Sequence, residues 1–162
     1  MAEISFYFTQ NDSCVARLIR RAEMGFPYHH VGLEVAPGQY LSAHWQDGVQ
    51  WRTPEQDRPR LYVRVPCPID EYVRWRNWAK AQINRRYDRA EILSMAERII
   101  TATPAEQGWT SNVICSALAL ESLIFLGRVP RVKVAPQRTI TPEGFSWLLM
   151  GMQPQLSFAR AT

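Results

Sequence analysis

Two residues far apart in the chain, a histidine and a cysteine, have the types and settings needed to do chemistry together. His30 opens the run His-Val-Gly-Leu-Glu-Val, whose alternation predicts a strand that begins with an imidazole. Cys115 opens the run Cys-Ser-Ala-Leu, which predicts the first turn of an apolar helix. Unpaired N–H groups and the helix dipole favour a thiolate there, and an imidazole opposite it can act as general base. The pair predicts a thiol-dependent hydrolase or acyltransferase.

The strand expected after that of His30 offers two candidates for a third polar group, which would fix the imidazole's tautomer and orientation. Ser42 and His44 are two residues apart, so their side chains share one face of a strand. Either could hold the ring of His30, and the sequence leaves the choice open. Gly32 lies on the same face as His30 and is expected to leave room for the Cys115 helix to approach.

Ordinary structural explanations compete with these assignments. A lone cysteine in an apolar helix is usually a small buried side chain, and a single histidine at a strand start is commonly structural. Cys14 is a rival nucleophile, because it follows Asp12-Ser13, a good helix cap, and lies near arginines. Cys67, between two prolines, is expected to be structural. We expect no metal and no other cofactor, because the sequence holds no CxxC or HxxxH pair.

The elements that must position these residues come in a simple order, with strands first and helices later. Alternating apolar residues and intervening turns predict strands over residues 4–9, 30–35, 40–45, 49–53 and 61–65. Helices are predicted after Ser13, over 69–86 and 88–100, from Cys115 to a stop at Gly127, and from Thr141. This order predicts an α+β fold, with one domain over residues 1–152 and a loose tail over 153–162.

Composition limits the classes of partner. The chain has 162 residues, 46% of them hydrophobic, and a formal net charge of +4, which favours anionic surroundings such as a cell wall or lipid headgroups. No nucleic-acid motif accompanies the arginines, so we expect no specific nucleic acid partner. The sequence shows no apolar run long enough to span a membrane and no signal-peptide core, so we expect synthesis in the cytoplasm.

Several short motifs carry a resemblance to a known family when they are taken in order. They are His30-Val-Gly, a second strand followed by Asp47-Gly-Val, Tyr87-Asp before a helix, Cys115-Ser at a helix start, and Thr141-Pro-Glu. In this order they resemble the circularly permuted NlpC-type papain-fold cysteine hydrolases and, more distantly, the lecithin retinol acyltransferase group. In the permuted members the catalytic histidine precedes the cysteine, as it does here.

The resemblance implies a permuted papain-like domain, in which a small antiparallel sheet packs on a central Cys-bearing helix. It makes Cys115 the nucleophile and His30 the base, with Ser42 or His44 in the third position. The substrates implied are acyl groups of peptides, including peptidoglycan, or of lipid esters and amides. Short members of this kind occur among phage and prophage proteins, which would place the chain in a virion or have it released. The alternative is a non-catalytic binding or structural module on the same scaffold, such as a phage accessory protein.

Overall fold

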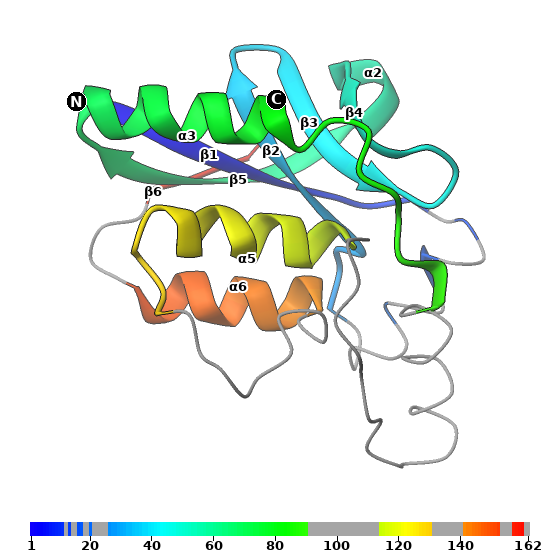
Figure 1. The fold of residues 1–162 in the computed structure, drawn as a ribbon. Helices are drawn as coiled ribbons and strands as arrows, with labels where there is room; N and C mark the ends of the chain where they lie inside the picture. Colours follow the sequence, from blue (N-terminus) through cyan, green and yellow to red (C-terminus); the bar gives the residue numbers. More distant parts are fainter. Residues whose placement is uncertain are drawn as a thin grey trace.

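The computed structural model describes residues 1–11, 13, 16–17, 20, 26–90, 114–130, 141–152 and 157–160, which form an α+β fold with a twisted antiparallel sheet (Figure 1). In the described part of the chain the sheet has the order β4-β3-β2-β1-β5-β6. Its strands are β1 (Ala2–Thr9), β2 (His30–Ala36), β3 (Gln39–His44), β4 (Gly48–Arg52), β5 (Pro59–Cys67) and β6 (Ser157–Arg160). The helices are α2 (Pro54–Asp57), α3 (Ile69–Ala81), α5 (Cys115–Phe125) and α6 (Pro142–Gly151).

The sheet has an apolar face and a polar face because its strands alternate. In β1, Phe6 and Phe8 point towards α6, where both rings contact Phe145 with centroids 5.2 and 6.4 Å away. Tyr7, between them, points to the opposite face, where it lies beside Gly32 of β2 in the antiparallel register. The polar residues of β1, β2 and β3 therefore gather on the face opposite to the phenylalanines.

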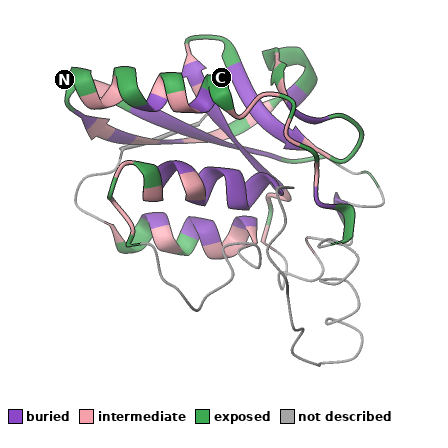
Figure 2. Ribbon diagram, viewed as in Figure 1, coloured by how far each residue is buried: buried purple, intermediate pink, exposed green. Residues whose placement is uncertain are grey.

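Helix α5 lies at the centre of the helical layer. It packs against β2 and β3 and also contacts α3 and α6, and most of its residues are buried (Figure 2). Burial on all sides explains why its sequence is apolar throughout rather than amphipathic. An ion pair between Glu121 of α5 and Arg85, with Nη2 and Oε1 3.2 Å apart, fixes α5 against the chain that follows α3. Helix α5 stops before Gly127, whose φ of +68° is the predicted left-handed end.

Two elements differ from the prediction at their ends. Helix α3 stops at Ala81 rather than at residue 86, because Asn84 adopts a positive φ of 68° and the backbone then turns to β4. There, Asn84 N donates to Val49 O and Val49 N donates to Arg85 O, both at 2.9 Å. The predicted tail contains β6, which pairs with β5 and so satisfies the backbone groups along that edge.

Other predictions fall outside the described residues in whole or in large part. These are the helix after Ser13, the helix over 88–100, and Cys14 itself. Among the described residues, no helix has both the length and the apolar character that a membrane span requires.

The free space above Gly32 is filled by the ring of Tyr7, not by the Cys115 helix as predicted. A Cβ on Gly32 would overlap the phenol end of that ring, and Tyr7 is fully buried. We therefore expect Gly32→Ala to lower the free energy of unfolding by about 1–3 kcal/mol, measured by urea denaturation. Gly151→Ala is the matched control, because a Cβ there meets no atom within 4 Å and a helical alanine is favoured. Equal effects at the two positions would contradict the steric argument.

Candidate functional site

Three of the predicted site residues lie together on the polar face of the sheet. The ring centroids of His30 and His44 are 4.5 Å apart, and His44 Nε2 lies 2.8 Å from Ser42 Oγ. The alternation of β2 and β3 had placed these side chains on common faces, and antiparallel pairing of the two strands brings those faces together. His44, rather than Ser42, is the one in ring contact with His30.

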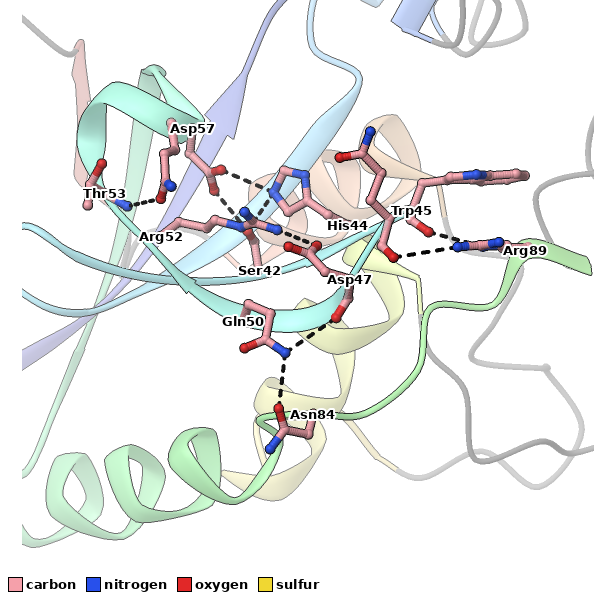
Figure 3. Close-up of polar contacts among 12 residues, drawn as sticks. Ser42, His44, Trp45, Asp47, Gln50, Arg52, Thr53, Asp57, Asn84 and Arg89 are labelled. Carbon is pink, nitrogen blue, oxygen red and sulfur yellow. Dashed lines mark hydrogen bonds and ion pairs between the residues drawn. The ribbon is translucent and has the colours of Figure 1, made fainter.

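The carboxylate at the centre of this cluster belongs to Asp57, which the sequence analysis missed. Its Oδ2 accepts a hydrogen bond from Ser42 Oγ at 2.8 Å, and Oδ1 lies 3.1 Å from His44 Nε2 (Figure 3). Oδ2 also accepts a hydrogen bond from the Tyr7 hydroxyl. Asp57 is 6% exposed. A buried carboxylate is tolerated only where its oxygens have such partners, so these four side chains form one unit.

A single helical turn, α2, turns Asp57 inward. Pro54 supplies the first helical residue, and Thr53 N donates to the side-chain oxygen of Gln56 at 2.9 Å. Arg58 then takes a left-handed conformation, with φ of 48°, and its N–H closes the turn on Pro54 O. Thr53-Pro54 was a readable signal for a helix start. Nothing in the sequence told which way Asp57 would face.

Burial sets the protonation of the cluster. Burial and the neighbouring His44 hold the pKa of His30 well below its usual range, although Asp57 opposes the shift. Burial alone would raise the pKa of Asp57, but the side chains of His44, His30 and Tyr7 lower it overall. The cluster at neutral pH is therefore a neutral His30 imidazole close to an ionised carboxylate, with the ring of His44 in contact with both.

Cys115 is the first residue of α5 and is 5% exposed. The preceding Ile114 offers no side-chain acceptor to the amide groups of the first turn, and that turn carries no acidic residue. Helix α5 packs against β2, the strand that His30 begins, and in Figure 1 the Cys115 end of α5 lies near the start of that strand.

A charge on Cys115 affects the pKa values of two buried phenols, those of Tyr7 and Tyr87. Burial raises the pKa of Tyr7, and Asp57 and a charge on Cys115 add to this shift. Burial likewise raises the pKa of Tyr87, with Cys115 as the next cause. Cys115 is thus within electrostatic reach of Tyr7, and through Tyr7 of the Asp57 cluster. Cys67, by contrast, belongs to the apolar core at the end of β5.

A pocket of about 440 Å³ opens next to these groups. The turn after β3 and the chain after α3 line it, and the ring of Trp45, which follows His44, lies against that of Tyr87, with centroids 6.2 Å apart. Arg89 lies over the Trp45 ring, with Cζ 5.5 Å from its centroid, and exposed Arg86 adds a second cation. The pocket thus offers aromatic surface and arginine side chains, and it is also lined by Asp47, which is ion-paired with Arg52, and by buried Asp88.

Comparisons with known proteins bring no assignment. No protein-family model matches the chain, and no curated protein matches it.

The pKa shift of His30 predicts a pH-dependent stability. The unfolded chain takes up a proton on His30 below about pH 6.5, whereas the folded chain does not, so stability is full above that pH and falls below it. We expect the free energy of unfolding to decrease as pH is lowered from about 7.5 to 5, with a slope approaching about 1.4 kcal/mol per pH unit. Urea denaturation across this range measures it. His30→Gln should flatten the profile; an unchanged slope in that variant would refute the assignment.

Proposed function

We propose that the protein is a thiol-dependent hydrolase or acyltransferase of amide or ester bonds, built on a permuted papain-like domain. The supporting observation is a single arrangement. Cys115 begins a buried helix that packs on the strand headed by His30, and His30 contacts a buried polar cluster that ends in the carboxylate of Asp57. A nucleophile, a base and an orienting chain are the three parts that covalent acyl transfer requires.

The neutral state of His30 suits the role of general base. The Cys115 sulfur attacks the carbonyl carbon while His30 accepts the thiol proton, and the carbonyl oxygen becomes an oxyanion near the amide groups at the start of α5. The bond to the leaving amine or alcohol then breaks, and His30 returns the proton to that group. Water or an acyl acceptor attacks the thioester, His30 takes its proton, and the thiol is regenerated.

His44 and Asp57 act as positioning residues in this scheme. Asp57 lies 3.1 Å from the Nε2 of His44, and the ring of His44 lies against that of His30. Ser42 contacts His44 and Asp57, so it supports His30 indirectly, through His44. The buried carboxylate also stabilises the imidazolium that forms when His30 takes the proton, because opposite charges attract strongly in a low-dielectric site.

The pocket beside Trp45 and Tyr87 is where we place the group next to the scissile bond. Its aromatic surface and the two arginines suit an acyl group or leaving group that carries a negative charge. Acidic cell-wall peptides and anionic lipid esters both meet this description, and they are the first substrates to screen.

Iodoacetamide alkylation tests the nucleophile without a known substrate. We expect Cys115 to react at pH 7.5 at least about tenfold faster than Cys67, whose thiol pKa is raised by burial and by Glu71. His30→Asn should slow Cys115 and leave Cys67 unchanged, as followed by mass spectrometry of the modified peptides. The two thiols are matched controls, because both are buried. An inert Cys115 would favour the non-catalytic binding module. Selective reaction at Cys14 would mean that Cys14, not Cys115, is the nucleophile.

A second comparison decides which residue orients His30. His44→Ala should lower the alkylation rate of Cys115 and shift its pH profile, because the ring in contact with His30 is lost. Ser42→Ala should have a smaller effect, and His44→Asn should restore part of the rate through its amide. A larger effect of Ser42→Ala would reverse the assignment, and circular dichroism of each variant controls for folding.

A further inference from the structure

We propose that His30, His44 and Asp57 form a binding site for a divalent transition-metal ion of the zinc class. Each residue offers one ligand atom, and these atoms all lie within 4.8 Å of one another. Tetrahedral zinc, with bonds of about 2.0–2.1 Å, needs neighbouring ligand atoms about 3.3 Å apart. His44 Nε2 and Asp57 Oδ1 are already 3.1 Å apart, so small side-chain rotations complete the geometry.

Unsatisfied buried atoms point to a ligand at this place. His30 Nε2 is buried and has no hydrogen-bond partner among the described residues, and Asp57 Oδ1 accepts no hydrogen bond beyond its 3.1 Å contact with His44 Nε2. Such atoms are rare in folded proteins because burying a polar group without a partner costs free energy. His30 is only 7% exposed, so water reaches it poorly. A metal ion would accept a lone pair from each of the two atoms and so give His30 Nε2 the partner it lacks.

The surrounding side chains prepare Asp57 for such a role. Tyr7 and Ser42 both donate to Oδ2, which fixes the carboxylate plane and leaves Oδ1 for the ion. Partners of this kind orient the ligands in many metal sites. Arg52, whose positive charge acts on His30, is held by an ion pair with Asp47, which offsets that charge. The side chain of His44 is 34% exposed and provides the route of entry.

Two histidines and one carboxylate are a ligand set that zinc and its neighbours accept with one position left for water or another group. The metal site is argued from its own geometry, but it shares His30 with the proposed function. An ion on His30 would occupy the lone pair that must accept the thiol proton. Bound metal would therefore inhibit alkylation of Cys115, which makes the ion a regulator rather than a helper of the thiol.

Cobalt titration of the intact protein tests the site. Co²⁺ should give visible d–d absorption without a thiolate charge-transfer band, and Zn²⁺ should displace it. We expect His44→Gln and Asp57→Asn to weaken Co²⁺ binding at least about tenfold. His29→Gln, a neighbouring histidine outside the site, and Cys115→Ser should leave binding unchanged. Because His44 is partly exposed, His44→Gln should fold normally, and circular dichroism checks this.

Three outcomes would overturn the proposal: no visible absorption, a thiolate band that disappears in Cys115→Ser, or binding that His44→Gln does not weaken. The proposed function fails by a different measurement, because alkylation in EDTA reports the thiol and base without any metal. If alkylation in EDTA depends on His30 and Co²⁺ does not bind, the metal site alone is wrong. If Co²⁺ binds as expected and Cys115 is inert, only the hydrolase proposal is wrong. When both hold, Zn²⁺ should slow alkylation of Cys115 and leave that of Cys67 unchanged.

Discussion

The buried carboxylate of Asp57 is the constraint on which the polar half of this structure depends. An ionised group away from water needs partners for both oxygens. Two strands supply them: β1 through Tyr7, and β3 through Ser42 and His44. Gly32 is part of the same requirement, because only a glycine lets the Tyr7 ring cross β2 to reach the carboxylate. The single turn of α2 places Asp57 at that point. Loss of any member leaves the charge less well compensated.

The polar cluster lies on the face of the sheet opposite to the phenylalanines, and His30 lies at the start of β2, the strand on which α5 packs. Phe6 and Phe8 serve the core packing with α6, while Tyr7, one residue from each, serves the carboxylate. Helix α5 packs on the strand of His30 and brings Cys115 within electrostatic reach of Tyr7. Burial disfavours the charged form of both groups. His30 is neutral for that reason, whereas Asp57 stays ionised because His44, His30 and Tyr7 stabilise its carboxylate.

Local signals were enough to predict most of the elements. Alternation located the first five strands, Gly127 marked the end of α5, and Thr141 caps α6 by accepting from Gly144 N. Side chains alternate between the two faces of a strand, and this period of two placed Ser42 and His44 on one face of β3 and His30 on one face of β2. These predictions needed only neighbours in sequence, and the register between β2 and β3 then brought the histidines together.

What the sequence did not reveal depends on contacts between distant segments. Asp57 is one acidic residue in a polar stretch, and only the fold shows that it faces Tyr7, fifty positions earlier. The pairing of β6 with β5 and the early stop of α3 likewise rest on partners far along the chain. Positions 30, 44 and 57 also lack the regular spacing of a metal motif, so a search for such motifs passes over them.

The backbone pairing of Asn84 and Arg85 with Val49 has a consequence for how the molecule behaves among its own copies. Strand β4 lies at one border of the sheet, and an open border can recruit a strand from a second molecule. The two hydrogen bonds at Val49 occupy that border at one residue, and Gly48 allows the chain to come so close because a side chain there would strike Arg85 O. The chain at Asn84 and Arg85 therefore disfavours self-association through β4, because it already pairs with Val49 there.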